Sequence, residues 1–340
     1  MRKHGKIALF GFVAALGLST LAGCSSSSDQ AEQISELTVY SGRSEEFIAP
    51  FFAEWEKETG ITLNIRYGDS AELAAQILEE GANSPADLFL SQDAGSLGAV
   101  ANAGLFIALP KSVVNDIPTE YVASNRDWVG VTGRSRVFAY APDAVKNLPT
   151  SYEDLIKPEF KGKLGIAPTN SSFQAFVTAL IEVKGESSAK RWLQDLQKND
   201  VKIYSKNSVI VEAIDNGEIS IGLVNHYYVW EVSQALGREI NVKIAFFSPG
   251  DLGNLINVSG AGIMKSSKKQ SAAEQLINYL TSRKTQEEFV NKTHEYSLLE
   301  GVIAPDQLPA LKEIGAPTVD LDSLDNVKGT QDLLIEVGLL

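Results

Sequence analysis

Cysteine, histidine and basic segments are scarce in this sequence. Its 340 residues include one cysteine, Cys24, and three histidines, so an intramolecular disulfide and a multi-thiolate metal site are both excluded. Acidic residues outnumber basic ones by 43 to 30, and no basic stretch is present that could displace counterions from a phosphate backbone. Nucleic acid is therefore not expected as a partner.

Signatures of several enzyme and metal-binding classes are also missing. The chain has no G-x-S-x-G elbow, no H-E-x-x-H or C-x-x-C motif, no EF-hand loop and no glycine-rich phosphate loop. Only His226 and His294 lie beyond the N-terminal segment, so few histidines are available for a Ser-His-Asp triad. A hydrolase that uses Asp69, Glu72 or Asp93 as acid and base remains an alternative, supported only by the abundance of carboxylates.

One long apolar run is present, and it lies at the N-terminus. Residues 7–21 are apolar and follow the basic residues Arg2, Lys3 and Lys6, which is the pattern of a secretory signal. No second run of that length follows, so a polytopic membrane protein is excluded. We expect a signal peptide at residues 1–23.

The signal ends in the sequence LAGC at residues 21–24, which resembles the bacterial lipobox. The resemblance implies that Cys24 is acylated and becomes the first residue of the mature protein. A serine run at 25–28 then predicts a flexible tether over residues 24–36. We expect an exported protein that is lipid-anchored, either in the periplasm or on the outer face of the plasma membrane.

From Leu37 onward, short apolar segments alternate with amphipathic ones, which predicts an α/β fold with a mainly parallel sheet. About 300 residues are enough to bury a core without disulfides, and the length favours two domains. Strands are predicted at 37–40, 63–67, 87–91, 136–140, 164–167, 219–224 and 260–264. Helices are predicted at 47–59, 71–80, 173–183, 189–197, 208–216, 270–280 and 285–291, with Ser70 as the N-cap of the second.

Two adjacent tyrosines, Tyr227 and Tyr228, stand between the strand at 219–224 and a following helix. Ligands of open α/β sheets bind beyond the carboxyl ends of strands, where a helix N-terminus favours negative charge. A hard, highly charged cation can displace the phenol protons and bind two phenolates there. Alternatively, one ring packs in the core and the other covers the surface; spacing alone leaves both interpretations open.

Two further kinds of loop could hold an anion. Asn170, Ser171 and Ser172 stand at a predicted helix start, where they either cap the helix or cradle an oxyanion. Arg43 and Arg134 lie near strand ends, where a guanidinium can bind an anion through two nitrogens or form a surface ion pair.

Six segments, taken in order, resemble the ferric-ion-binding proteins of ABC importers, a branch of the periplasmic binding proteins. They are LTVYSGR (37–43), SPADLFLSQ (84–92), WVGVTGRSRV (128–137), SKNSVIVEAIDNGEI (205–219), VNHYYVW (224–230) and SGAGIMKSS (259–267). The resemblance implies a two-lobe type II clamp with a mixed, mainly parallel sheet in each lobe. The first lobe is expected to combine residues 36–131 with 258–308, and the second 132–257 with 309–340, with hinge crossings near residues 131 and 257.

The same resemblance implies a site that holds ferric iron (Fe3+) as cargo between the lobes. Its phenolate ligands are Tyr227 and Tyr228, and hard ferric iron prefers such anionic oxygen donors. A synergistic anion, either carbonate, phosphate or citrate, completes the coordination. The implied anion-binding residues are Asn170, Ser171, Ser172, Asn207, Asn225, Arg134 and Arg43. The protein is then a monomer, not an enzyme, that delivers iron to an ABC permease and its ATPase.

The sequence departs from that family at two positions. Many relatives carry a histidine in the first loop and a glutamate after SPAD, where this chain has Ser44 and Gln92. Both are poor ligands for ferric iron, although His226 could compensate. The cargo could then be chelated iron; alternatively, the clamp takes an oxyanion, a polyamine or another small ligand, and the tyrosines stack on it.

Overall fold

The computed structural model describes residues 34–305 and 308–340. The expected signal peptide, the lipidated Cys24 and most of the tether lie outside these residues and stay predictions. In the described part of the chain, no helix is both long enough and apolar enough to cross a bilayer.

Strands and helices alternate regularly from β1 to α3, as the sequence predicts, and less regularly beyond it. The strands are β1 (Glu36–Ser41), β2 (Thr62–Tyr67), β3 (Leu88–Ser91), β4 (Val129–Tyr140), β5 (Leu164–Ile166), β6 (Lys202–Ile203), β7 (Ile221–Asn225), β8 (Lys243–Ala245), β9 (Ile256–Ile263) and β10 (Tyr296–Ser297). The helices are α1 (Glu45–Thr59), α2 (Ser70–Glu80), α3 (Ala94–Asn102), α4 (Lys111–Val114), α5 (Ser171–Lys184), α6 (Glu186–Lys198), α7 (Asn207–Asp215), α8 (Tyr228–Leu236), α9 (Gln270–Leu280), α10 (Arg283–Thr293) and α11 (Val327–Glu336).

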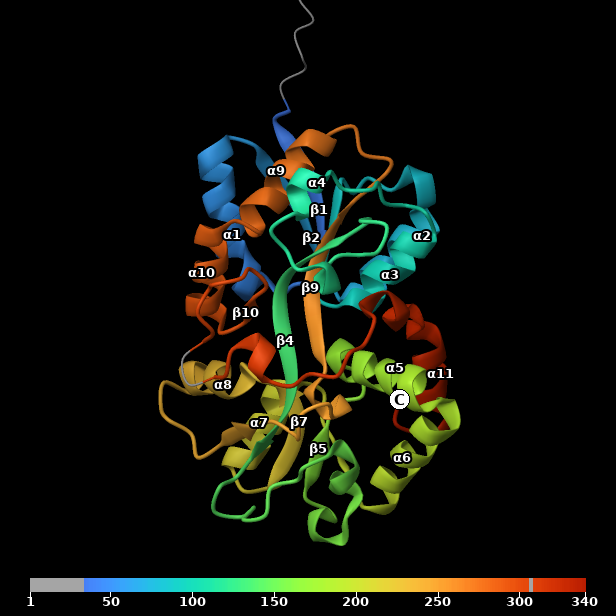
Figure 1. Cartoon of the computed structure of the whole chain (residues 1–340), viewed down its shortest axis with the longest axis vertical. Helices are drawn as coiled ribbons and strands as arrows, with labels where there is room; N and C mark the ends of the chain where they lie inside the picture. Colours follow the sequence, from blue (N-terminus) through green and yellow to red (C-terminus); the bar gives the residue numbers. More distant parts are fainter. Residues whose placement is uncertain (1–33, 306–307) are drawn as a thin grey trace, which may run out of the picture. The chain divides into compact units, whose positions relative to one another are not determined.

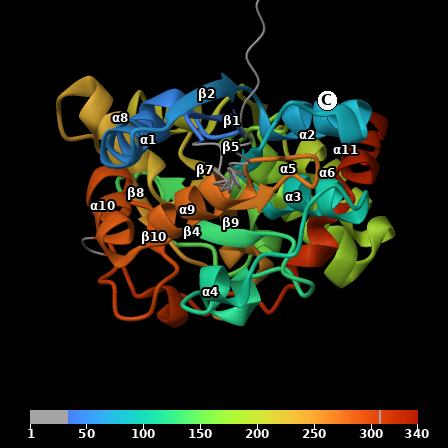
Figure 2. The same ribbon diagram turned by 90° about the horizontal axis from the view of Figure 1, so that it is seen from above.

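The strands form one mixed sheet in the order β2-β1-β3-β9-β4-β7-β5-β6, with β8 and β10 also paired to β4. The outer pairs β1–β2, β1–β3, β5–β6 and β5–β7 are parallel, whereas β9 and β4 pair antiparallel to their neighbours. Helices α1, α8 and α10 lie on one side of the strands, and α2, α3, α5, α6 and α11 lie on the other (Figures 1 and 2).

Strand β4 connects two groups of elements. Its first half pairs with β9 and β10, and its second half pairs with β7 and β8. The register between β4 and β9 shifts between Gly130 and Thr132, an irregularity that bends a strand locally. We call β1, β2, β3, α1, α2 and α3 the first group, and β5, β6, β7, α5, α7 and α8 the second group.

The buried face of helix α1 is the one that its hydrophobic pattern predicts. Ile48, Phe51, Phe52 and Trp55 are all buried on one face, as their spacing predicts. The helix ends at Gly60, whose left-handed backbone (φ 73°) donates its N–H to Glu56 O at 2.8 Å.

The predicted cap of α2 is wrong by one residue. Asp69, not Ser70, is the N-cap, and its Oδ1 accepts a hydrogen bond from Ala71 N at 2.9 Å. Ser70 is the first helical residue, and its hydroxyl instead accepts a hydrogen bond from Gln92 N at 2.9 Å. That tertiary bond, to a residue 22 positions away, has no local sequence signal.

Strand β7 carries the chain to the tyrosine pair, and α7 packs closely against it. A methyl group added at Gly222 would collide with Cγ2 of Ile210 on α7. We therefore expect Gly222→Ala to lower the free energy of unfolding by about 1–3 kcal/mol, because a tightly packed core resists an added methyl group. Urea denaturation measures the change.

A second variant checks that this loss comes from the collision. Ile210→Ala removes the colliding atom, so the Gly222→Ala, Ile210→Ala pair should cost less than the sum of the two single changes. Strict additivity would show that the contact between α7 and β7 is not the cause.

Candidate functional site

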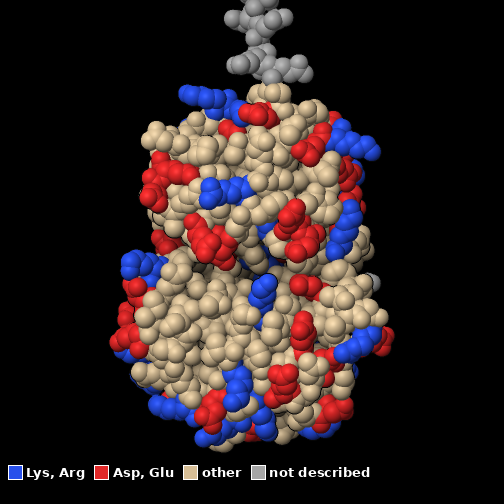
Figure 3. All heavy atoms as spheres, turned by 180° about the vertical axis from the view of Figure 1, so that it is seen from behind, with Lys and Arg blue, Asp and Glu red and all other residues tan. Residues whose placement is uncertain are grey.

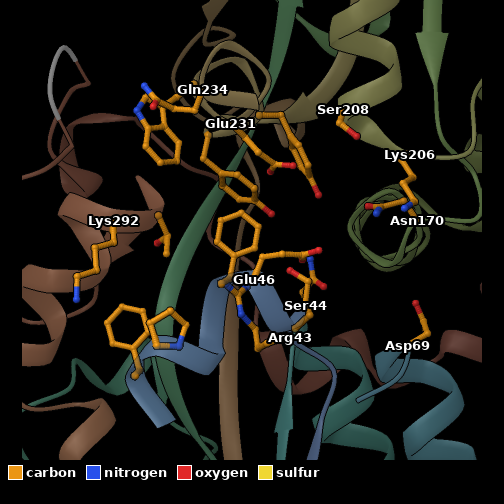
Figure 4. A pocket seen from close by; sticks show the side chains of 18 of the residues that line it. Arg43, Ser44, Glu46, Asp69, Asn170, Lys206, Ser208, Glu231, Gln234 and Lys292 are labelled. Carbon is orange, nitrogen blue, oxygen red and sulfur yellow. The ribbon is translucent and has the colours of Figure 1, made fainter. Parts of the chain in front are cut away.

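A pocket of about 800 Å³ opens between the first and second groups. A space-filling view shows the surface hollowed between the upper and lower elements, with charged side chains of both signs around the hollow (Figure 3). In the close-up, residues from the two groups face one another across the pocket (Figure 4). The lining includes Arg43, Ser44, Glu46, Phe47, Asp69 and Gln92 from the first group, and Thr169, Asn170, Lys206, Ser208, Tyr227, Tyr228, Glu231 and Gln234 from the second.

The two tyrosines lie side by side in this pocket, at the turn that links β7 to α8. Their ring centroids are 4.5 Å apart, and the planes are inclined by 33°. The ring of Tyr227 is buried. It packs edge-to-face with Phe47 from α1, and the two ring centroids are 5.9 Å apart. Burial raises the pKa of Tyr228 well above its usual value, so this phenol is protonated at neutral pH in the absence of a cation.

The predicted anion-cradle residues form a hydrogen-bonded network. Asn225 Nδ2 donates to Ser172 Oγ at 3.1 Å, and Ser172 Oγ donates to Asn170 Oδ1 at 2.6 Å. Asn207 Nδ2 donates to the same Asn170 oxygen at 3.2 Å. The starts of α5 and α7 and the end of β7 are thereby tied together. Ser171 lies outside this network and lines a separate small cavity.

Arg43 forms a buried ion pair with Glu295. Its Nη1 and Nη2 donate to the two carboxylate oxygens at 2.9 and 2.7 Å, and the side chains are 4% and 0% exposed. This pair links segments 252 residues apart. Arg43 also lines the pocket, and its role in anion binding stays a prediction.

Arg134 and Arg136 lie two residues apart on β4, so their side chains leave the same face of the strand. Arg134 Nη2 donates to the carbonyl oxygen of Gln92, and Arg136 Nη1 donates to Asn225 Oδ1 at 3.3 Å. Nε and Nη1 of Arg134 and Nε and Nη2 of Arg136 are buried with no partner within residues 34–305 and 308–340. Burial lowers the pKa of Arg136 to about 10.

Unpartnered buried N–H groups are costly, and a bound anion would satisfy them. Arg136 was not among the candidates from sequence. The alternation R-x-R on a strand could have identified it, because it places both guanidinium groups on one face.

Ser44 and Gln92 line the pocket, whereas His226 does not present a free ring nitrogen to it. His226 Nδ1 accepts from Ser135 N at 3.2 Å, which leaves the proton on Nε2, and Nε2 donates to His294 O at 2.7 Å. Burial lowers the pKa of His226 to about 4, so the ring is neutral at pH 7. Its ring packs edge-to-face with the ring of Tyr227, with 5.4 Å between the two centroids, and thus orients that ring.

The carboxylates named for a hydrolase serve as helix caps or lie in a helix. Asp69 caps α2, and Asp93 Oδ1 caps α3 by accepting from Ser96 N at 2.8 Å. Glu72 lies in the first turn of α2. In the described residues, no group of three or more His, Cys, Asp or Glu side chains is placed to hold a metal ion. A metal in this pocket would therefore depend on the phenolates.

Glu231 is a pocket residue that was not predicted from the sequence. It follows Tyr227 by four residues and Tyr228 by three, so helical periodicity could have placed all three on one face. Its carboxyl group points into the pocket (Figure 4). Burial, together with the charge of Glu46, raises the pKa of Glu231 to about 7.

Comparison with solved structures shows to which class of protein this strand order and this pocket belong. The fold matches the iron-bound HitA protein of Pseudomonas aeruginosa with a TM-score of 0.84 and 33% identity, over 89% of this chain and 99% of that one. It also matches a Trichodesmium protein in complex with iron and citrate, with a TM-score of 0.75 and 28% identity, over 89% and 99% of the two chains. The chain thus has the two-lobe periplasmic-binding-protein clamp predicted from sequence.

The family follows from the sequence itself. Residues 83–327 match the bacterial extracellular solute-binding proteins, and the chain belongs to that family. The Fe(3+)-binding periplasmic protein of Serratia marcescens is 33% identical over 339 residues, covering 98% of this chain and 99% of that protein. The major ferric iron-binding protein of Neisseria meningitidis serogroup B is 32% identical over 311 residues, covering 90% and 94%. The resemblance to ferric-ion-binding proteins is confirmed, and these relatives are binding proteins by name.

Proposed function

We propose that this protein is the extracytoplasmic solute-binding component of an iron importer, and that it binds ferric iron through Tyr227 and Tyr228. The observation that carries the proposal is the pair of adjacent phenols, 4.5 Å apart between ring centroids, at the N-terminus of α8 in the pocket. Relatives over nearly the whole chain are named for ferric iron binding. Ferric iron is hard, prefers anionic oxygen and can displace phenol protons, so the donors suit the cargo.

A synergistic anion completes the proposed site. The unpartnered nitrogens of Arg134 and Arg136 would supply positive charge and donors to the anion, and a phenolate at Tyr227 would act electrostatically on both guanidinium groups. Asn207 and Asn225 add polar partners from the network behind the pair. Carbonate, phosphate and citrate all offer the oxygen atoms that such donors bind.

The two-lobe clamp would capture iron between its lobes and deliver it to a permease. The proposed lobes are 36–131 with 258–308 and 132–257 with 309–340, and the register shift at Gly130 supports a hinge crossing near residue 131. The closed, loaded form would dock as a monomer on an ABC permease and its ATPase. A lipid anchor on Cys24 would hold the protein at the membrane while it does so.

Chelated iron is a second candidate cargo. A pocket of about 800 Å³ has room for a ferric complex with an organic acid as well as for a bare ion with carbonate. Lys206, at the pocket edge, offers a cation for a free carboxylate. One structural relative holds iron and citrate, which supports this version of the proposal.

A visible absorption titration tests the function. The full chain, purified in a mild detergent, is titrated with ferric citrate and bicarbonate, and with Zn2+ as a control ion. We expect a coloured phenolate-to-iron charge-transfer band with iron only, because the filled d shell of zinc cannot accept an electron. Absence of a band with ferric iron would contradict the assignment and favour a different small ligand in the pocket.

A further inference from the structure

The structure provides one carboxylate in the same pocket and on the same helix face as the tyrosine pair. Glu231 follows Tyr228 by three residues on α8, a spacing that brings side chains together on one face of a helix. All three side chains line the pocket. A charge on Glu231 also contributes to the raised pKa of the Tyr228 phenol, after burial and Tyr227.

The carboxyl group of Glu231 lacks a partner that would explain its position. Within the described residues, its Oε2 is buried and accepts no hydrogen bond. Leaving such an oxygen unsatisfied costs free energy of folding, whereas a cation bound at that point would remove the cost. The side chain nevertheless points into the pocket rather than outward to water (Figure 4).

The proposed cargo needs such a group. Two phenolates cancel only two of the three charges of ferric iron, and they fill only two positions around the ion. On the opposite wall, Ser44 and Gln92 stand where the family resemblance places a histidine and a glutamate, and their neutral oxygens bind a hard trivalent ion weakly. The synergistic anion would supply further charge and oxygens but leaves with the cargo, whereas a carboxylate adds a hard anionic donor that belongs to the protein.

We propose that Glu231 is the third protein ligand of ferric iron and donates a carboxylate oxygen beside the phenolates of Tyr227 and Tyr228. This assignment rests on the proposed function of the pocket. It makes α8 the source of the protein ligands, with Tyr227 as its N-cap and Tyr228 and Glu231 in its first turn.

The other carboxylates of the pocket are less suited to this role. Asp69 Oδ1 already accepts the capping hydrogen bond of α2. Glu46 is exposed in the first turn of α1, on the opposite wall from α8. Glu46 carries the same charge and lines the same pocket, but it has no buried oxygen without a partner. The Glu46→Gln variant therefore controls for the loss of a pocket charge alone.

The test compares Glu231→Gln with Glu46→Gln and wild type in the full chain. Ferric citrate with bicarbonate is the probe, and both the charge-transfer band and the ferric affinity, by competition with EDTA, are measured. We expect Glu231→Gln to keep a band but move it to longer wavelength, because iron that loses an anionic donor accepts phenolate electrons more readily. Affinity should fall by at least about tenfold, whereas Glu46→Gln should change it by about threefold or less, since an exposed charge is screened.

The experiment distinguishes failure of the ligand assignment from failure of the proposed function. No band in wild type would overturn the proposed function and this assignment with it. A wild-type band, with Glu231→Gln equal to Glu46→Gln in affinity and in band position, would overturn the ligand role of Glu231 alone. A Glu231→Asp variant that restores the wavelength would support it further, because it returns the carboxylate on a shorter side chain.

Discussion

The Tyr227→Phe, Tyr228→Phe double variant is expected to lose ferric iron binding while it keeps its fold. Removing both hydroxyl groups takes away two anionic oxygen donors, and no neutral oxygen of the pocket walls replaces them for a hard trivalent ion. The rings themselves stay, so the edge contacts of Tyr227 with Phe47 and His226 are preserved. The visible band should vanish, and the melting temperature should stay close to that of wild type.

A matched control separates the loss of this pair from the loss of phenols in general. Tyr67 and Tyr204 are half-buried and stand outside the residues that line the pocket. The Tyr67→Phe, Tyr204→Phe variant should therefore keep both band and affinity. Iron affinity that survives in the Tyr227, Tyr228 variant would refute the proposed ligands, whatever the relatives bind.

The second large effect concerns the stability of the fold. We expect Glu295→Gln to lower the free energy of unfolding by about 3–5 kcal/mol, because it leaves the charge of Arg43 buried without its counter-ion. The amide keeps the shape of the carboxylate, so the loss would come from charge rather than from packing. Urea denaturation of the two proteins measures it.

Two comparisons show whether burial is the cause. Glu288→Gln breaks a surface pair with Lys292, 2.7 Å long, and should cost below about 1 kcal/mol. Replacing both Arg43 and Glu295 by methionine removes both charges and should recover much of the loss. Equal effects of the Glu295 and Glu288 substitutions would show that the buried pair contributes no more than a surface one.

Local patterns in the sequence were enough to predict most helices and the position of the tyrosine pair. The apolar face of α1 and the junction of β7 with α8 depend on neighbours within a few residues, so periodicity reveals them. The long strands were predicted too short. Gly130, Gly133 and Arg134 interrupt the apolar pattern of β4, yet the strand runs through them because β9 and β10 pair with it there.

The site contains features that no local pattern predicts. The partner of Arg43 lies 252 residues further along the chain, so a cluster of charges in the sequence says nothing about their pairing. The Asn170 network likewise joins the starts of α5 and α7 to the end of β7 only after the chain has folded. The family resemblance implied roles for several residues but none for Arg136 or Glu231, whose proposed roles rest on burial and missing partners within the described residues.

The distribution of donors between the two groups has a consequence for release. Tyr227, Tyr228, Glu231 and the asparagine network all belong to the second group, while the first group contributes mainly a wall with Phe47 and Gln92. An ion seated on these ligands would stay with the second group even if the two groups moved apart. Widening the pocket would then expose the cargo to water and to competing chelators without detaching it. Unloading would have to act on the iron–oxygen bonds themselves, through protons, reduction or a stronger acceptor.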